Sequence, residues 1–336
     1  MEVRPPQKKM ETEIRQLEEL GRIKEQIYQQ IHKVIVGQDK IIEKILIGLF
    51  SCGHCLLIGV PGLAKTLMVK TLSQILDLSF KRIQFTPDLM PSDITGTEII
   101  EQDKTTFERK FRFIKGPVFA NLVLADEINR APPKTQSALL ESMQELQVTV
   151  GGKVYPLPQP FLVLATQNPI ELEGTYPLPE AQLDRFMISI KIDYPSEEEE
   201  KKIAEIMSGE TLPELEKVLS AEKILNLQKI IRKIPVSDYV LTYATKLVRS
   251  TRPGYDGNFK FIEEYVNWGA GPRGLQFLVL GAKAKVALRG DVNVSINDIK
   301  ELAPDVLRHR IFTNFNADAD GISSEDIIKK LTEQIQ

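Results

Sequence analysis

The feature that most constrains the fold is a glycine-containing loop between an apolar run and a helix-forming segment. The loop lies in the stretch CLLIGVPGLAKT at residues 55–66. An apolar run of this length is typical of a buried strand, and the residues after the loop can open a helix. Backbone N–H groups at 62–66 can then point at a β- or γ-phosphate, while Lys65 adds a positive charge and Thr66 can bind Mg²⁺. The segment therefore predicts a phosphate-binding loop in an α/β protein.

One residue of this loop departs from the usual G-x-x-x-x-G-K-[ST] pattern, because Ala64 stands where a glycine is expected. A methyl group is tolerated there if the local φ is negative, and it can lower the affinity for phosphate. An ordinary Gly-Pro turn between a strand and a helix is the alternative interpretation.

Polar residues also end two further apolar runs. The run at 122–125 is followed by Asp126 and Glu127, and the run at 161–166 is followed by Gln167 and Asn168. Apolar runs of this kind are typical of parallel strands that are buried on both faces. Ligands of open α/β sheets bind beyond the carboxyl ends of the strands, so we expect these side chains to meet the phosphate loop at one edge.

Each of these polar residues has an expected role in phosphoryl transfer from ATP. Asp126 is expected to bind Mg²⁺ together with Thr66, directly or through water. Glu127 is expected to act as the base or to position the attacking water. Asn168 would orient the same water or contact the γ-phosphate, and its alternative role is that of a turn residue before Pro169. The expected cofactors are ATP and Mg²⁺.

Composition limits the class of protein. The chain has 336 residues, of which 42% are hydrophobic, so it can bury more than one core. Its net charge of −3 offers no general basic field to a nucleic-acid backbone, which argues against a DNA translocase. Residues 1–9 lack an apolar signal region, and the uncharged span 45–64 is broken by glycine and proline. We therefore expect a cytoplasmic protein with no membrane insertion and no nucleic-acid partner.

The segment Cys52-Gly53-His54-Cys55 has the C-x-x-C spacing of a redox site. A reactive thiol of that type normally follows a strand and opens a helix, where the helix dipole stabilises the thiolate. Here the motif follows a predicted helix and precedes a predicted strand. We therefore expect Cys55 to be a small buried residue. A zinc site formed with His32 is disfavoured by the crowding of three ligands within four positions.

Turn and cap signals divide the chain into three parts. Residues 11–33 have apolar positions at helical spacing, which predicts an amphipathic N-terminal helix within 1–34. Residues 97–115 and 148–155 predict two hairpins within a nucleotide-binding core at 35–194, the first inserted within a helix. Ser196 is expected to cap the first helix of an all-α domain at 195–336, in which Ser295 or Asn297 caps a later helix.

Several segments together resemble the MoxR branch of the AAA+ ATPases, over the span from about Ile35 to Ile311. The order of these segments along the chain, and their number, carry the resemblance. They are VGQ at 36–38, GVPGLAKT at 59–66, PSDITG at 91–96, ADEINRAPPK at 125–134, ATQNP at 165–169, PEAQLDRF at 179–186, GPR at 271–273 and APDVLRHR at 303–310.

The resemblance implies a three-layer α/β/α core of the P-loop type with a parallel sheet, followed by a smaller all-α lid domain. It implies that nucleotide is bound by residues from two segments, namely Val36, Gly37 and Gln38 at the adenine, and Gly59, Pro61, Gly62, Leu63, Ala64, Lys65, Thr66 and Leu67 of the phosphate loop. It also implies roles for three arginines. Arg273 resembles a sensor that reaches the γ-phosphate of its own subunit, and Arg185 resembles a finger that enters the neighbouring subunit's site. Arg130 could assist in trans or be a solvated surface residue.

The function that the resemblance implies is chaperone-like remodelling or maturation of a protein partner, driven by ATP hydrolysis in a homo-oligomeric ring, most simply a hexamer. The two predicted hairpins would correspond to elements that face the pore of such a ring. The implied client carries a von Willebrand factor A-like domain or is a metalloenzyme such as methanol dehydrogenase. The alternative is a module that assembles on ATP with little turnover, and steady-state phosphate release distinguishes the two.

Overall fold

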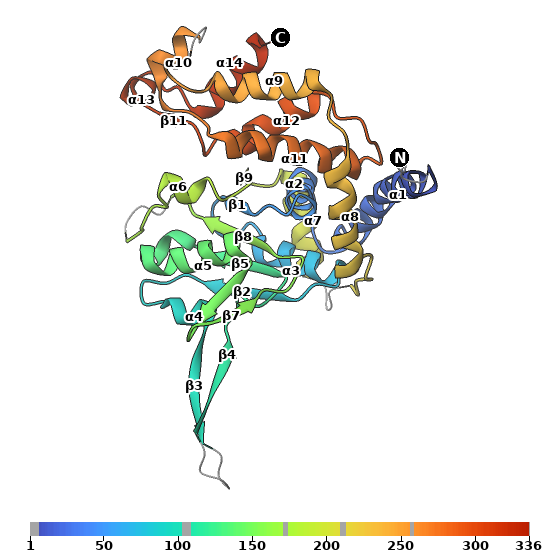
Figure 1. Cartoon of the computed structure of the whole chain (residues 1–336), viewed down its shortest axis with the longest axis vertical. Helices are drawn as coiled ribbons and strands as arrows, with labels where there is room; N and C mark the ends of the chain where they lie inside the picture. Colours follow the sequence, from blue (N-terminus) through green and yellow to red (C-terminus); the bar gives the residue numbers. More distant parts are fainter. Residues whose placement is uncertain (1–6, 103–108, 171–173, 209–212, 256–258, 336) are drawn as a thin grey trace, which may run out of the picture.

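A five-stranded parallel sheet forms the centre of the protein (Figure 1). The structure, a computed structural model, describes residues 7–102, 109–170, 174–208, 213–255 and 259–335. The strands lie in the order β2-β5-β8-β1-β9, and each neighbouring pair is parallel. Their bounds are Cys55–Ile58 for β1, Phe80–Gln84 for β2, Leu122–Asp126 for β5, Leu162–Gln167 for β8 and Ile188–Lys191 for β9. The predicted α/β fold is confirmed.

Helices cover both faces of this sheet. Side chains alternate along each strand, so that in β5 Leu122 and Leu124 pack on one face while Val123 and Ala125 pack on the other. The first face is covered by α2 (Asp39–Phe50) and α3 (Lys65–Ile75), and the second by α5 (Pro133–Glu145). This double burial explains the continuous apolar runs of the sequence and gives the three layers of the core. Short elements complete it: α4 (Pro91–Thr95), the 3₁₀ turn η1 (Ile128–Arg130) and α6 (Glu180–Leu183).

The C-terminal part is a helical lid, as predicted, with one small addition. Its helices are α7 (Glu197–Met207), α8 (Ala221–Lys233), α9 (Asp238–Arg249), α10 (Lys260–Tyr265), α11 (Pro272–Leu288), α12 (Ile296–Leu307), α13 (Phe315–Asp320) and α14 (Ser324–Gln334). The addition is an antiparallel pair of short strands, β10 (Val266–Trp268) and β11 (Phe312–Thr313). Ser196 caps α7 and Ser295 caps α12, each in a capping box, so Ser295 rather than Asn297 has the predicted role.

The lid and the core share one continuous apolar cluster. It includes the α2 and α3 face of the sheet and the buried faces of α8, α9, α11 and α12. The N-terminal helix α1 (Gln7–Ile31) packs into the same cluster, and a Cβ at Gly21 would lie 3.2 Å from the backbone nitrogen of Gly290. The close approach at this glycine joins α1 directly to the end of the lid helix α11. Among the described residues, no helix is both long and apolar enough to cross a bilayer.

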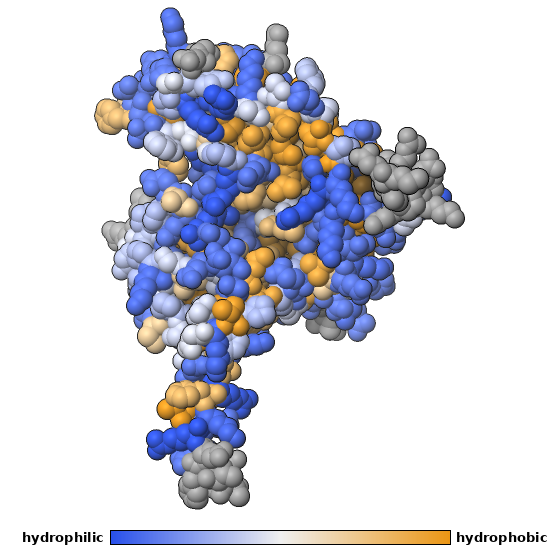
Figure 2. Space-filling view, viewed as in Figure 1, coloured by the Kyte–Doolittle hydropathy of each residue, from blue (hydrophilic) through white to orange (hydrophobic). Residues whose placement is uncertain are grey.

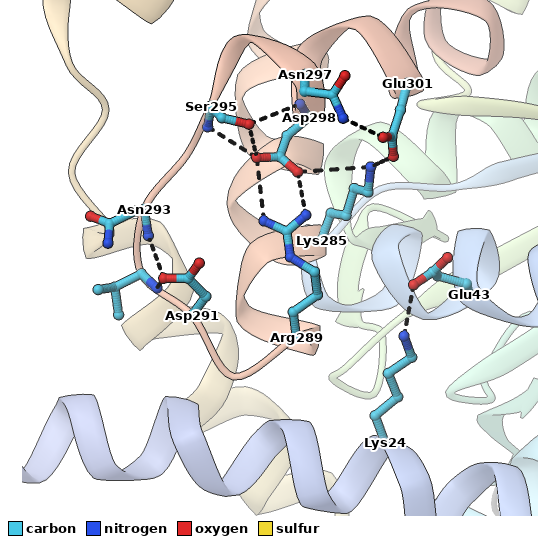
Figure 3. Close-up of polar contacts among 11 residues, drawn as sticks. Lys24, Glu43, Lys285, Arg289, Asp291, Asn293, Ser295, Asn297, Asp298 and Glu301 are labelled. Atoms are coloured by element: carbon cyan, nitrogen blue, oxygen red, sulfur yellow. Dashed lines mark hydrogen bonds and ion pairs between the residues drawn. The ribbon is translucent and has the colours of Figure 1, made fainter.

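Charged groups fix α12 against α11 in the interior of the lid (Figure 3). The fully buried carboxylate of Asp298 accepts hydrogen bonds from both terminal nitrogens of Arg289, at 2.6 and 3.4 Å, and from the Ser295 hydroxyl at 2.7 Å. Burial alone would raise the pKa of Asp298, but these donors lower it below its ordinary value. Nearby, Lys24 of α1 pairs with Glu43 of α2 at 2.8 Å. Specific polar contacts therefore fix the relative positions of α11 and α12, and of α1 and α2, in addition to their apolar packing.

Two hairpins leave the second face of the core. The first, β3 (Gly96–Gln102) with β4 (Arg109–Lys115), extends away from the body, and the second pairs β6 (Gln147–Val150) with β7 (Lys153–Pro156) (Figure 1). Phe113 stacks on Tyr155 with ring centroids 4.1 Å apart, so the hairpins lie side by side. The paired side chains of Ile100 and Phe111 are 60% and 68% exposed on the long hairpin, whose surface carries apolar residues in Figure 2.

The long hairpin differs from its prediction in one respect. It follows the short helix α4 directly, but residues 116–121 after it form turns, so it does not interrupt a helix. The turn of the second hairpin is formed by Gly151 and Gly152, with φ values of 57° and 75° that glycine adopts without strain.

The C-x-x-C segment begins at the exposed Cys52 and then enters the core, where residues 53–55 are buried. Cys55 lies in β1 and is fully buried, as expected. Burial raises the pKa of its thiol to about 12, so the thiol stays protonated. His54 donates from Nε2 to the Met143 carbonyl of α5 at 3.2 Å and accepts the Val163 N–H of β8 at Nδ1, 3.0 Å away. The neutral imidazole thus links the residue that precedes β1 to α5 and β8. Among the described residues, no group of three or more His, Cys, Asp or Glu side chains is placed to hold a metal ion.

The buried imidazole predicts a specific pH dependence of stability. Burial lowers the pKa of His54 from 6.5 to about 4, so the unfolded chain binds more protons between these values and stability falls as the pH falls. The free energy of unfolding should lose roughly 2 kcal/mol from this residue between pH 7 and pH 5. Urea unfolding of His54→Gln, which keeps a donor and an acceptor, should lack this part of the pH dependence. An equal pH dependence in both proteins would contradict the assignment.

Candidate functional site

A cavity of about 420 Å³ lies at the carboxyl edge of the sheet. It brings together the phosphate loop and the polar ends of β2, β5 and β8. The residues that line it are Pro61, Gly62, Leu63, Ala64, Lys65, Thr66, Leu67, Arg82, Asp126, Glu127, Thr166 and Asn168. The convergence of Lys65, Asp126, Glu127 and Asn168 that the sequence predicted is therefore found in the structure.

The predicted phosphate loop contains two residues with a left-handed backbone. Gly62 has a φ of 87° with open space where a side chain would stand, so the loop is free to receive a ligand there. Ala64 also lies in the left-handed region, at φ 54°, directly before α3 begins at Lys65. The condition stated from the sequence, a negative φ that would tolerate the methyl group, is therefore not met, and the loop keeps a glycine-type turn at Ala64. A non-glycine residue in this region costs about 1–2 kcal/mol.

The side chain of Lys65 is held by a hydrogen bond within the same loop. Its ammonium donates to the carbonyl oxygen of Gly59, at the start of the loop. Burial lowers the pKa of Lys65, while Asp126 and Glu127 act in the opposite direction. Gly59 itself has no room for a side chain, because a Cβ would lie 2.7 Å from the Ile192 carbonyl oxygen. The ammonium is thus directed along the inner side of the loop.

Asp126 is held by two neighbouring strands. Its Oδ1 accepts the Thr166 hydroxyl of β8 at 2.6 Å, and its Oδ2 accepts Nη2 of Arg82 from β2 at 2.7 Å. The carboxylate of Asp126 and the hydroxyl of Thr66 line the same cavity and are oxygen ligands of the kind that Mg²⁺ prefers. The donor set fits the ion, provided that it replaces the Arg82 guanidinium at Oδ2.

Glu127 has a strained backbone and a restrained side chain. Its φ is 55°, and its N–H donates to the Thr166 hydroxyl at 2.8 Å. Its Oε2 accepts Nε2 of Gln84 at 2.9 Å and Nη1 of Arg130 at 3.1 Å. A positive φ in a non-glycine residue is often found at functional sites, where the surrounding contacts maintain it.

Asn168 forms the predicted turn and also lies at the cavity. Its Oδ1 accepts the backbone N–H of Ile170 at 3.1 Å, which forms the expected turn around Pro169. It also lines the cavity beside Thr166. The turn therefore holds the side chain at the site.

Arg82, Gln84 and Thr166 were not predicted from the sequence as residues of this site. Arg82 and Gln84 are alternate residues near the end of β2, and the parallel register sets Gln84 beside Asp126. The sequence did hold a signal for both residues. The strand Phe80–Gln84 is only half apolar, and Arg82 and Gln84 are two positions apart, so their side chains lie on the same face of the strand. Thr166 could have been inferred from its position as the last buried residue of β8.

The segment Val36 to Gln38 lies outside the lining of this cavity. Gly37 and Gln38 are both left-handed, with φ values of 63° and 62°, and a Cβ at Gly37 would collide with the Glu199 carboxylate of α7. Oε1 of Gln38 is buried and has no hydrogen-bond partner in the part of the chain that the structure describes. An unpartnered acceptor fits a ligand that brings its own N–H donor, such as the amino group of adenine.

Arg185 and Arg273 also lie outside the lining of the cavity, and they share another hollow of about 150 Å³. Nη1 of Arg185 donates to the Leu140 carbonyl of α5 at 2.8 Å, and Nη1 of Arg273 donates to Oδ2 of Asp184 at 3.2 Å. Arg185 therefore contacts α5, and Arg273 contacts the residue that ends α6. The predicted contact of Arg273 with its own γ-phosphate would need a different placement of its side chain or of the lid.

Comparison with known proteins was consistent across sequence and structure. Residues 54–188 match the ATPase family associated with various cellular activities (AAA), and residues 259–331 match the AAA lid domain. The chaperone MoxR1 of Mycobacterium tuberculosis is 46% identical over 91% of this chain and 80% of its own length. The protein MoxR of Methylorubrum extorquens is 29% identical over 84% and 85%. The crystal structure of a candidate ATPase from Cytophaga hutchinsonii superposes with a TM-score of 0.91 at 43% identity, covering 98% of both chains.

The strain at Ala64 can be tested directly. Ala64→Gly should raise the free energy of unfolding of the nucleotide-free protein by about 1 kcal/mol, because glycine adopts the left-handed turn without a Cβ clash. Urea unfolding monitored by circular dichroism measures this change. Gly62→Ala is the matched control and should destabilise by a similar amount, since Gly62 has a φ of 87°. A destabilised Ala64→Gly protein would contradict the strain.

Proposed function

Because this chain belongs to the MoxR family of AAA+ ATPases, we propose that it couples ATP hydrolysis at the phosphate-loop cavity to the remodelling or maturation of a protein partner. The observation that carries the proposal is the single cavity that Lys65, Asp126 and Glu127 share at the end of the sheet. A cation, a metal-binding carboxylate and a second carboxylate for water are the groups that hydrolysis of a phosphoanhydride requires.

In the proposed reaction, the N–H groups of the phosphate loop and the Lys65 ammonium bind the β- and γ-phosphates. Thr66 and Asp126 would hold Mg²⁺, which when bound neutralises charge on the phosphate oxygens. Glu127 accepts a proton from the attacking water or orients it, and Asn168 orients the same water. Arg82 would leave Asp126 when the metal is bound and then offers its charge to the phosphates in the same cavity.

The restraint on Glu127 supports its role as the water-positioning group. Gln84 and Arg130 hold one of its oxygens, and the Thr166 contact fixes its backbone. These three contacts come from β2, η1 and β8, so the carboxylate has a defined direction before any ligand is bound. Adenine would be bound by Val36, Gly37 and Gln38, where the unpartnered Gln38 oxygen supplies an acceptor.

The proposed active form is a ring, most simply a hexamer, in which Arg185 completes the site of the neighbouring subunit. Its placement outside the lining of its own phosphate-loop cavity supports a role in trans. The two hairpins, which lie side by side with exposed Ile100 and Phe111, would face the pore and contact the client. The proposed client is a protein with a von Willebrand factor A-like domain or a metalloenzyme that requires maturation.

Two substitutions separate nucleotide binding from hydrolysis. Lys65→Ala should lose ATP binding, because the charge in the loop is removed, whereas Glu127→Gln should retain ATP and lose turnover by roughly 10²–10⁴-fold. Titration calorimetry and steady-state phosphate release measure the two effects. Micromolar ATP affinity in Lys65→Ala would refute the phosphate loop, and normal turnover in Glu127→Gln would assign the water to another residue. Negligible turnover in the wild-type protein would favour a nucleotide-gated assembly module instead.

The trans role of Arg185 predicts complementation between inactive subunits. Arg185→Ala should bind ATP normally and lose roughly 10³–10⁵-fold in turnover, as expected when an arginine finger is removed. Mixing it with Lys65→Ala should restore part of the activity, because an intact Lys65 site can then receive Arg185 from its neighbour. Subunit exchange is checked with fluorescent labels. If exchanged mixtures never exceed the sum of the two separate variants, Arg185 does not act in trans.

A further inference from the structure

The backbone on both sides of Arg185 is held by one arginine of the lid. Residues 184–187 connect α6 to β9, and Arg310 follows α12 in the lid. Its Nη2 donates to the carbonyl oxygens of Asp184, at 2.9 Å, and Phe186, at 2.6 Å. Its Nη1 lies 3.4 Å from the Met187 carbonyl, and its Nε donates to Oδ1 of Asp184 at 2.8 Å. Three of the four carbonyl oxygens in this short connection therefore accept hydrogen bonds from one guanidinium.

Arg310 is itself immobilised within the lid. Only 1% of its side chain is exposed, and its guanidinium lies 5.1 Å from the centre of the Phe277 ring of α11. A Cβ at Gly274 would come within 3.2 Å of its Cδ, so the first turn of α11 packs directly against it. His309, the preceding residue, lies with Nε2 2.9 Å from the Phe186 carbonyl. Any displacement of α11 and α12 must therefore be transmitted to the connection that bears Arg185.

We propose that Arg310 is a positioning residue for Arg185: from the lid of a subunit, it orients the arginine that this subunit lends to its neighbour. The inference rests on the proposed trans role of Arg185. Arg310 does not line the phosphate-loop cavity, so it acts through the backbone of residues 184–187. The position of the lid in one subunit thereby affects the active site of the next subunit.

Asp184 gives the lid a second hold on the same connection. While Oδ1 accepts Nε of Arg310, Oδ2 accepts Nη1 of Arg273 at 3.2 Å. Arg273 lies in the first turn of α11, and Arg310 follows α12, so residues from two lid helices meet at one carboxylate. Because that carboxylate immediately precedes Arg185, a change in either contact alters the support of the finger.

The first test is the substitution Arg310→Lys, which keeps the charge but cannot reach several carbonyls at once. Turnover should fall by about tenfold to a hundredfold, because a catalytic group that is displaced by up to about 1 Å loses activity on this scale. The dissociation constant for ATP should stay within about twofold of the wild-type value. Arg308→Lys is the matched control, because Arg308 pairs with Asp305 and Glu325 in the lid instead. It should change turnover by no more than about twofold.

The decisive readout is complementation with Lys65→Ala. If Arg310 acts through Arg185, an Arg310→Lys subunit has an intact site of its own and lacks only a well-placed finger for its neighbour. Lys65→Ala subunits supply that finger, so the mixture should exceed the sum of its parts. If Arg310 instead serves its own subunit's site, no mixture is rescued. That result, with rescue of Arg185→Ala in parallel, would refute the inference alone, whereas failure of both mixtures would refute the trans role of Arg185.

Asp184→Asn provides a second variant if Arg310→Lys does not fold. The amide keeps an acceptor for Arg310 and leaves the three carbonyl contacts intact, but it removes the charge that both arginines share. Turnover should fall by a smaller factor, of about threefold to tenfold, and should again be rescued by Lys65→Ala. Unchanged turnover, or a loss that the mixture does not rescue, would contradict the proposal.

Discussion

The parallel register of the central strands is the constraint on which the site depends. It sets Gln84 beside Asp126 across β2 and β5, and it sets Thr166 of β8 beside Leu57 of β1. Since side chains alternate between the two faces of a strand, a slip of one residue would turn each polar end away from the others. The packing of the strand side chains against helices on both faces is thus also what collects Asp126 and Glu127 next to the predicted phosphate loop.

The lid is joined to the same framework instead of forming a separate core. One apolar cluster runs from the α2 and α3 face of the sheet into α8, α9, α11 and α12, and α1 packs along it. Polar contacts then fix specific positions of this junction. The most extensive are the hydrogen bonds from Arg310 to the backbone on both sides of Arg185. A lid that is packed in this way can transmit a change at one end of the molecule because its interior is not easily deformed.

Much of this arrangement could be predicted from the sequence, and the exceptions have physical causes. Continuous apolar runs identified β1, β5 and β8 because they are buried on both faces, and the caps at Ser196 and Ser295 were visible in their spacing. Arg82 and Gln84 were missed because β2 is a half-exposed edge strand whose polar residues look like surface residues. The left-handed turn at Ala64 was missed because local sequence disfavours it and the loop imposes it. The contacts of Arg310 join residues more than a hundred positions apart, which no local pattern reveals.

The central claim is that each active site is completed by a residue from another subunit. The most direct measurement is steady-state phosphate release per subunit over a wide range of protein concentration, with the oligomeric state followed by sedimentation velocity in the same buffer. The account predicts that turnover per subunit rises in parallel with the fraction of assembled protein and approaches zero for the monomer. Constant turnover per subunit down to concentrations at which only monomer sediments would contradict it.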